Sequence, residues 1–329
     1  VTAALEYTPI AEPTATLGMM QALVESQGDG WAHATDEVRQ FYDAVQGRPV
    51  PPAQMPSASD FESLVRTDVP PAVKDVLSGY LAVAGTLGRR TAGLHLALAS
   101  NAGDPALAPE PFTAADLAHI SVNATAEAQH AFDALRALQR QSHERPPEDL
   151  SARIDQFLRR EPAVMERLHA APALEYSTTK IRIHGDYHLG QVLWSEGDFY
   201  LLDFEGEPSK SIMQRRLKQS PLKDVAGMLR SFSYAAHAGL FAFTAGRPDV
   251  MEHFAQWADV WERWTTATFL REYFESVTSA LFLPANPDQR DELLGLFVLE
   301  KALYELNYEI NNRPDWLRIP LSGILRLFD

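Results

Sequence analysis

Two neighbouring stretches decide the fold: IHGDYHLGQVLW, residues 183–194, and FYLLDFEGEP, residues 199–208. Around residues 181–203 the sequence changes to three short runs of β type, KIRIH, QVLW and FYLLD, separated by polar or glycine-containing turns. The polar side chains that stand out in this segment are His184, Asp186, His188, Gln191 and Asp203. We therefore expect a β-hairpin between residues 186 and 203 that brings two carboxylate-bearing loops together.

Asp186, Gln191 and Asp203 fit the roles that phosphoryl transfer requires. In kinases an Asp accepts the proton of the attacking hydroxyl, an amide five residues later binds a metal, and a later Asp holds the metal on the phosphates. Here Gln191 follows Asp186 by five residues, and Asp203 begins a D-F-E sequence in place of D-F-G. The pattern predicts Asp186 as the catalytic base, ATP as the cosubstrate, and Gln191 and Asp203 as Mg²⁺ ligands, with Glu205 as a further carboxylate.

The two histidines carry less information than the carboxylates. An H-x-D sequence alone is common, and it is the D-F-E sequence seventeen residues after Asp186 that favours a phosphotransferase. We expect His184 to brace the backbone of the loop. His188 is the second predicted catalytic residue, because it could approach the phosphates, although packing alone would also explain it.

Composition narrows the class of protein. The chain has 329 residues, 46% of them hydrophobic, which is enough for a sizeable core. A formal net charge of −15 argues against nucleic-acid binding, since phosphate backbones need clustered Lys and Arg. The absence of cysteine excludes disulfides and thiolate chemistry and fits a cytoplasmic protein. No apolar run approaches the ~20 residues of a membrane-spanning helix, so we expect no membrane association.

Outside the β segment the hydrophobic pattern is helical. The predicted helices cover residues 30–47, 73–100, 114–141, 148–170, 222–245, 250–278 and 287–311. A break near Gly85 or Gly88 is expected in the second of these, and a linker is expected over residues 48–60. The expected architecture is mostly α with a small β insertion.

The helix near the C-terminus has one face that could bind an acceptor. Lys301, Tyr304, Glu305 and Tyr308 are spaced i, i+3, i+4 and i+7, so they share one side of a helix. Such a face suits a sugar, because aromatic rings stack on its apolar faces and charged groups bond its hydroxyls. By pattern alone, an amphipathic helix with buried tyrosines is the better explanation. Arg313 and Trp316 are weaker candidates for the same pocket, and Trp31 is expected to pack rather than bind.

The chain resembles the bacterial maltokinases, including the kinase modules fused to trehalose synthase. The resemblance rests on HGDYHLGQVLW and FYLLDFEGEP, and extends to QGDGW (27–31), LGRRTAGLHLAL (87–98) and EKALYELNYEINNRPDWLRIPL (300–321). These enzymes belong to the aminoglycoside-phosphotransferase-like branch of the protein-kinase fold. Gln191 in place of Asn and the DFEGEP sequence distinguish them from ordinary aminoglycoside or choline kinases.

The resemblance implies an activity and an acceptor site. The reaction would transfer the γ-phosphoryl group of ATP to the anomeric hydroxyl of maltose, and the maltose 1-phosphate would feed glycogen or α-glucan synthesis. Trehalose synthase would be a fused or bound partner. The resemblance also favours the sugar-binding interpretation of the C-terminal helix, with Lys301, Tyr304, Glu305, Tyr308 and Arg313 as substrate residues.

The resemblance also implies a domain organisation. Residues 1–10 would be a hinge strand, whose backbone at Glu6, Tyr7 and Thr8 would bind adenine. Residues 11–329 would form the C-terminal lobe of a kinase, with a helical intermediate region over 11–112 and the catalytic loop and substrate-binding helices over 113–329.

The sequence contains no element that would cover the phosphates. G-x-G-x-x-G and G-K-[ST] sequences are absent, and neither Lys74 nor Lys180 has the expected strand context. The N-terminal lobe is therefore expected to be missing from this chain, which would transfer phosphate weakly or not at all by itself. Two alternatives remain: a related kinase acting on an aminoglycoside, choline or another sugar, and a non-catalytic interaction module with a kinase-like fold.

Overall fold

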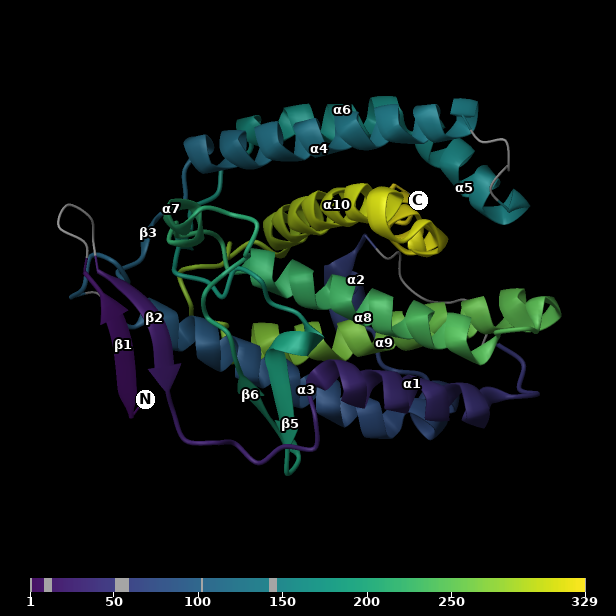
Figure 1. Ribbon diagram of the computed structural model, residues 1–329, viewed down its shortest axis with the longest axis horizontal. Helices are drawn as coiled ribbons and strands as arrows, with labels where there is room; N and C mark the ends of the chain where they lie inside the picture. Colours follow the sequence, from purple (N-terminus) through teal and green to yellow (C-terminus); the bar gives the residue numbers. More distant parts are fainter. Residues whose placement is uncertain (1, 9–13, 51–58, 102, 142–146, 329) are drawn as a thin grey trace.

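The computed structural model describes residues 2–8, 14–50, 59–101, 103–141 and 147–328 (Figure 1). The predicted mostly helical class is confirmed, because helices predominate and the strands are few and short. The helices are α1 (Gly30–Val45), α2 (Phe61–Arg66), α3 (Pro71–Ala99), α4 (Ala114–Gln141), α5 (Glu148–Arg159), α6 (Glu161–Ala170), α7 (Ile212–Arg215), α8 (Leu222–Phe243), α9 (Met251–Ser276), α10 (Pro287–Asn312) and α11 (Arg318–Leu325). The strands are β1 (Ala3–Tyr7), β2 (Ala15–Met20), β3 (Glu110–Pro111), β4 (Thr179–Lys180), β5 (Val192–Ser195) and β6 (Asp198–Leu201).

The helices pack in layers around one core. Helix α3 packs along α9, α8 packs against α1, α9 and α10, and α4 covers the other side of α10 (Figure 1). Helix α9 contributes Trp257, Trp261 and Trp264, which are fully buried. Their i, i+4, i+7 spacing gives α9 a broad aromatic face, and the burial of such large rings dominates the energetics of a core. Among the described helices, none combines the length and the apolar content that a membrane-spanning segment needs.

The predicted hairpin is present and is built by β5 and β6. The strands pair antiparallel from Val192 opposite Leu201 to Ser195 opposite Asp198. Glu196 and Gly197 form the two-residue turn and both have positive φ, at 50° and 85°. This is the backbone that a tight hairpin turn requires, and glycine adopts it without strain. The hairpin therefore fixes the distance between the loop before β5 and the loop after β6.

Two predicted helices differ from the structure. Helix α3 is not broken at Gly85 or Gly88. A Cβ on Gly88 would lie 2.4 Å from the backbone oxygen of Phe269, so this glycine allows α3 to pack closely on α9. The predicted helix over 148–170 is divided at Arg160 into α5 and α6. Pro162, in the first turn of α6, cannot donate a backbone hydrogen bond to α5, which explains the division.

Strand predictions were also wrong in part. The first predicted strand, 180–184, is reduced to the end of β4, after which Ile181 exchanges two backbone hydrogen bonds with Gln219. Strand β2 and helix α2 were not predicted, and β2 interrupts the region 11–112 that was expected to be helical. Most of the predicted linker (51–58), together with residues 1, 9 and 10 of the predicted hinge, lies outside the described residues.

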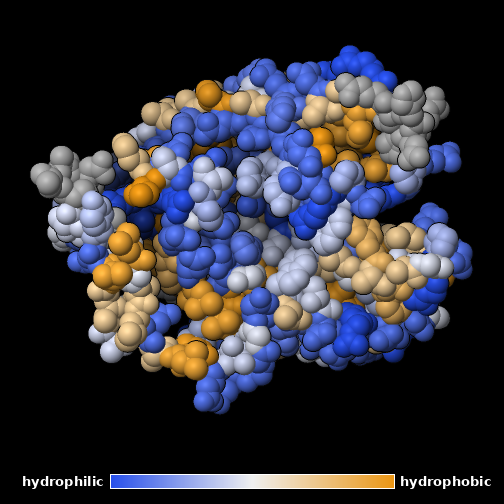
Figure 2. All heavy atoms as spheres, in the orientation of Figure 1, coloured by the Kyte–Doolittle hydropathy of each residue, from blue (hydrophilic) through white to orange (hydrophobic). Residues whose placement is uncertain are grey.

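The β1–β2 hairpin exposes apolar side chains. Leu5, Leu17 and Met20 are each about 65% exposed. Figure 2 shows hydrophobic side chains gathered over this hairpin, on the left of the view. A contiguous exposed apolar surface is typical of a site that contacts another protein segment or a ligand.

Candidate active site

The loop that precedes β5 is anchored by one buried carboxylate. Asp224, in the first turn of α8, accepts hydrogen bonds from the backbone nitrogens of His184 (2.7 Å) and Gly185 (2.9 Å). His95 of α3 contacts the same carboxylate, with its Nε2 3.2 Å from Oδ2. Burial alone would raise the pKa of Asp224, but its hydrogen bonds and the positive potential of the two histidines hold it below its ordinary value. Asp224 is therefore charged and fixes the loop to the helical core.

Helix α8 also contacts the loop at two further points. A Cβ on Gly227 would lie 2.5 Å from the backbone oxygen of Tyr187, and the hydroxyl of Ser231 accepts a hydrogen bond from the backbone of Leu189 at 3.1 Å. Sequence reasoning missed Asp224, Gly227 and Ser231. The signal that was available is an acid directly before the apolar run VAGML in PLKDVAGMLRSF (221–232), because a carboxylate on a buried helix face needs a partner.

The close contact at Gly227 yields a test. We expect Gly227→Ala to displace the loop and to lower any turnover that depends on it at least tenfold, with a loss of ~1–3 kcal/mol in the free energy of unfolding from overpacking. Gly93→Ala is the matched control, because Gly93 is also helical but a Cβ there would meet no atom within 4 Å. The control is expected to be neutral or stabilising by up to ~1 kcal/mol. Steady-state kinetics and urea denaturation measure both effects, and equal behaviour of the two variants would contradict the expectation.

Gln191 and Asp203 meet as the hairpin predicted. The side-chain nitrogen of Gln191 donates to Oδ2 of Asp203 at 3.0 Å. An amide that donates through nitrogen keeps its carbonyl oxygen for a cation, so the pair offers amide and carboxylate oxygens, which suit Mg²⁺. Asp203 has a left-handed backbone (φ 58°), a strained conformation that turns the chain sharply after β6. Glu205 is 61% exposed and lies 3.6 Å from the guanidinium of Arg215. This ion pair competes with the binding of a metal ion by the Glu205 carboxylate.

A different acidic cluster is not a metal centre. In the part of the chain that the structure describes, His237, Asp259 and Glu262 are the only three metal-ligand side chains that converge. The guanidinium of Arg326 lies 2.7 Å from Asp259 and 2.9 Å from Glu262. Because a cation already lies between the two carboxylates, this cluster is an ion-pair network.

Asp186 and the two histidines occupy distinct positions. His184 braces the loop, with its Nε2 2.6 Å from the backbone oxygen of Leu202. His188 lies nearer the reactive side, with Nε2 3.9 Å from Oδ2 of Asp186. Its Nδ1 accepts the backbone N–H of Gly190 at 3.0 Å, so the neutral ring carries its proton on Nε2. Burial lowers the pKa of His188, against the opposing effect of Asp186, and the ring is neutral at pH 7.

The predicted acceptor residues line one pocket beside this loop. The pocket has a volume of ≈ 430 Å³, within the range of small-molecule sites. It is lined by Asp29, Trp31, His188, Gly190, Gly227, Ser231, Tyr234, Lys301, Tyr304, Glu305, Tyr308, Glu309, Arg313 and Trp316. All five predicted substrate residues are thus brought together with His188. Trp31, which was expected only to pack, also lines the pocket, as does Trp316.

The two carboxylates of α10 that line this pocket are each paired with a guanidinium group. Oε2 of Glu305 accepts from Nε of Arg230 at 2.8 Å, and Glu309 binds Arg313 through two bonds of 2.9 and 2.7 Å. The ammonium of Lys301 lies 5.0 Å from the ring centre of Tyr304. Burial and the neighbouring carboxylate of Glu207 raise the pKa of Tyr304 to about 12, so its hydroxyl remains a hydrogen-bond donor.

The predicted adenine contacts lie on the β1–β2 hairpin. Glu6 pairs with Thr16 and Tyr7 with Ala15, while the hydroxyl of Thr8 lies 2.9 Å from that of Thr14. The side chains of Glu6, Tyr7 and Thr8 are exposed. The backbone hydrogen bonds to β2 occupy one edge of β1.

Asp186, the Gln191–Asp203 pair and a substrate-sized pocket lie on or beside one anchored loop. Phosphoryl transfer needs groups of these kinds close together. In agreement, residues 28–206, more than half of the chain, match the model of the phosphotransferase enzyme family. The chain therefore belongs to this family.

Similar proteins carry the name glucosamine kinase. One from Streptacidiphilus jiangxiensis is 28% identical over 237 residues, which are 72% of this chain and 47% of that protein. One from Mycolicibacterium smegmatis is 31% identical over 153 residues, 44% of this chain and 34% of that protein. The chain thus spans less than half the length of these curated relatives.

Solved structures of glucosamine kinase share the fold. One crystal form superposes with a TM-score of 0.65 at 24% identity, covering 92% of this chain and 60% of that chain. A complex with glucosamine, ADP and inorganic phosphate gives a TM-score of 0.63 at 25% identity, with coverages of 92% and 61%.

Proposed function

We propose that this chain carries the catalytic loop and acceptor site of an ATP-dependent sugar kinase. The observation that supports it most is the pocket that joins His188 of the catalytic loop to the aromatic and charged face of α10. Aromatic rings beside hydrogen-bonding groups suit a polyhydroxylated acceptor. The relatives named glucosamine kinase support a sugar as the acceptor class.

The proposed mechanism assigns one role to each group. Asp186 accepts the proton of the attacking sugar hydroxyl, while the oxygen of that hydroxyl forms the new bond to the γ-phosphorus of ATP and ADP leaves. Gln191 and Asp203 would hold Mg²⁺, which would supply positive charge to neutralise the phosphates. His188, neutral and protonated on Nε2, donates a hydrogen bond toward the transferred phosphoryl group. Asp224 keeps the loop in place through the backbone of His184 and Gly185.

The acceptor we propose is maltose, phosphorylated on its anomeric hydroxyl to give maltose 1-phosphate. Lys301 and Tyr308 are seven residues apart, so the pocket follows α10 for about 10 Å. That length suits two linked sugar rings. The carboxylates of Glu305 and Glu309 are both engaged by guanidinium groups, which favours a neutral acceptor over an amino sugar. Glucosamine, named for the relatives, is the alternative acceptor.

We also propose that β1 belongs to the hinge of the ATP site, with adenine bound by the backbone at Glu6, Tyr7 and Thr8. The exposed apolar side chains of the β1–β2 hairpin support a surface that further protein covers in the active enzyme. A protein partner such as trehalose synthase remains part of this proposal, on the resemblance alone.

A panel of acceptors tests the proposed function. The protein is incubated with ATP and Mg²⁺ and with maltose, glucose, glucosamine, choline or an aminoglycoside, and ADP release is followed by a coupled assay. This chain alone should turn over weakly or not at all, whereas the chain joined to a lobe that covers ATP should turn over maltose and give a product that is labile to acid and lacks a reducing end. Turnover with glucosamine instead would reject maltose and retain the sugar-kinase class, and turnover only with choline or the aminoglycoside would reject both.

A further inference from the structure

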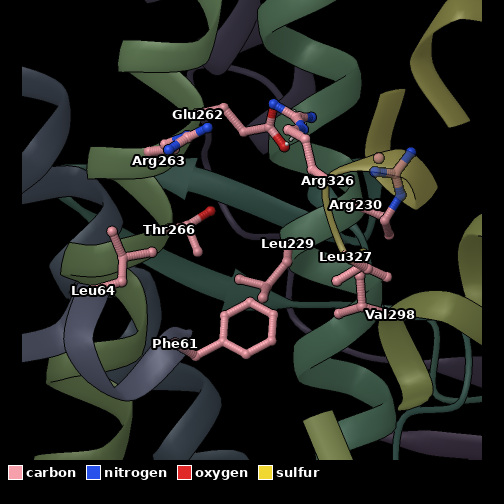
Figure 3. Close-up of a pocket in the computed structure, with 11 residues that line it drawn as sticks. Phe61, Leu64, Leu229, Arg230, Glu262, Arg263, Thr266, Val298, Arg326 and Leu327 are labelled. Atoms are coloured by element: carbon pink, nitrogen blue, oxygen red, sulfur yellow. Dashed lines mark hydrogen bonds and ion pairs between the residues drawn. The ribbon is translucent and has the colours of Figure 1, made fainter. Parts of the chain in front are cut away.

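Arg230 of α8 lies directly behind the acceptor pocket. Its side chain is 3% exposed, and its Nε donates to Glu305 at 2.8 Å. Glu305 lines the acceptor pocket, whereas Arg230 lines a second, smaller cavity of ≈ 50 Å³. Figure 3 shows this cavity, with Glu262 turned toward Arg326 and Arg230 beside them. The guanidinium therefore stands between the two cavities and controls the charge on one wall of the first.

The fold makes room for this guanidinium. Gly323 of α11 lies against Arg230, and a Cβ at that position would collide with its Nη1. Arg230 also lies over the ring of Tyr234, 5.8 Å from its centre, and Tyr234 lines the acceptor pocket. Among the atoms that the structure describes, Nη2 of Arg230 is buried without a hydrogen-bond partner. Burying a charged guanidinium with an unbonded N–H costs free energy. Its contact with Glu305 explains why a charge stands at this buried position.

The remaining carboxylates around the pocket are also engaged. Glu309, 1% exposed in its side chain, binds Arg313 and accepts from the hydroxyl of Tyr234 at 2.9 Å. Asp29 caps α1 by accepting the backbone N–H of Ala32 at 2.7 Å. Arg313 is 44% exposed, so solvent screens its charge, whereas the charge of Arg230 acts through a buried region.

We propose that Arg230 is a specificity-determining residue that makes the acceptor pocket select neutral sugars over amino sugars by neutralising Glu305. This inference rests on the proposed sugar-kinase function and deepens it. With Arg230 in place, an incoming ammonium group finds Glu305 already paired and meets the charges of Arg230 and Lys301. Without the guanidinium, Glu305 would present an unpaired carboxylate beside the pocket, and an ammonium on the acceptor could offset its charge.

The experiment compares Arg230→Gln with the wild-type protein and with Arg230→Lys, which keeps the positive charge. The acceptors are a matched pair: the neutral sugar that the wild type phosphorylates best and its 2-amino-2-deoxy derivative. The measured quantity is the ratio of kcat/KM for the two acceptors. Dissociation constants from the fluorescence of Trp31 and Trp316, which line the pocket, give a readout that does not require turnover.

We expect the wild type to prefer the neutral sugar at least tenfold. Arg230→Gln should shift the ratio toward the amino sugar by tenfold or more, which corresponds to ~1.4 kcal/mol, and Arg230→Lys should keep the wild-type preference. Arg230→Gln leaves Glu305 buried without its partner, so its fold is checked by thermal unfolding with and without the amino sugar. If the amino sugar raises the Tm of Arg230→Gln and the neutral sugar does not, the inference is supported, even where the variant is less stable than the wild type.

Gly323→Ala serves as a second variant, because it crowds the guanidinium without removing its charge. It should weaken the binding of both sugars and leave their ratio unchanged. An unchanged ratio in Arg230→Gln, or a wild type that prefers the amino sugar, overturns the inference and leaves the sugar-kinase function intact. Failure of the chain joined to an ATP-covering lobe to phosphorylate any sugar rejects the proposed function, while the binding ratios still decide the role of Arg230.

Discussion

Replacement of Asp186 by Asn is expected to lower kcat by about 10²–10⁴-fold, the usual contribution of a positioned general base. Asn is nearly isosteric with Asp and cannot accept the proton of the attacking hydroxyl. Asp186 lies beside His188 on the catalytic loop, and its side chain is only 21% exposed, so few other groups could replace it as a base. The measurement is ATP-dependent phosphorylation of the best acceptor at saturating ATP and Mg²⁺.

The same substitution should leave substrate binding largely intact. Asp186 is not part of the Gln191–Asp203 pair, so nucleotide binding in the presence of Mg²⁺ should change little. Asp203→Asn offers the contrast, because it removes a metal ligand and should weaken Mg²⁺-dependent nucleotide binding as well as turnover. Asp43→Asn, an exposed position on α1, is the matched control and should behave as the wild type. Retention of more than a tenth of the activity by Asp186→Asn would rule out its role as the base.

Replacement of Asp224 by Ala is expected to have the largest effect on stability. It leaves the backbone nitrogens of His184 and Gly185 and the ring of His95 without their common acceptor. Removing one partner from a buried charged network costs ~3–5 kcal/mol. The loop that carries Asp186 would also lose its anchor, so activity should fall below detection even where the protein remains folded. Urea denaturation and the kinetic assay measure the two effects separately.

The sign of the pH dependence at Asp224 follows from its lowered pKa. Its pKa in the folded protein lies below the ordinary value of 3.8, so its contribution to stability is complete above that value. The contribution is lost as the pH falls through the lower, folded-state pKa. The stability difference between the wild type and Asp224→Asn should therefore be constant between about pH 5 and pH 8 and shrink in acid. A difference that grows on acidification would contradict the anchoring role.

The hairpin and the candidate metal pair could be predicted from the sequence. Their signals are local: a change of hydrophobic period near residue 181, an Asp–Gln spacing of five, and a second Asp seventeen residues after the first. A two-residue turn with a glycine fixes the pairing of β5 with β6, so Gln191 and Asp203 meet at 3.0 Å without information from distant segments. The long helices could also be predicted, from the helical period of their hydrophobic residues. Their ends were predicted less well, because caps and prolines such as Pro162 decide where a helix stops.

The sequence by itself determined the helical class, the loop that carries Asp186 and the face of α10 that carries Lys301, Tyr304 and Tyr308, because each depends on the spacing of residues close in the chain. Only the tertiary structure decided that Asp224 anchors the loop, that Trp31 joins the acceptor pocket and that Arg230 neutralises Glu305. Arg230 and Glu305 are seventy-five residues apart, and Asp224 and His95 are one hundred and twenty-nine apart. Such contacts arise when α8 packs against α10 and its first turn meets α3, and no local pattern records which buried charges will then become partners.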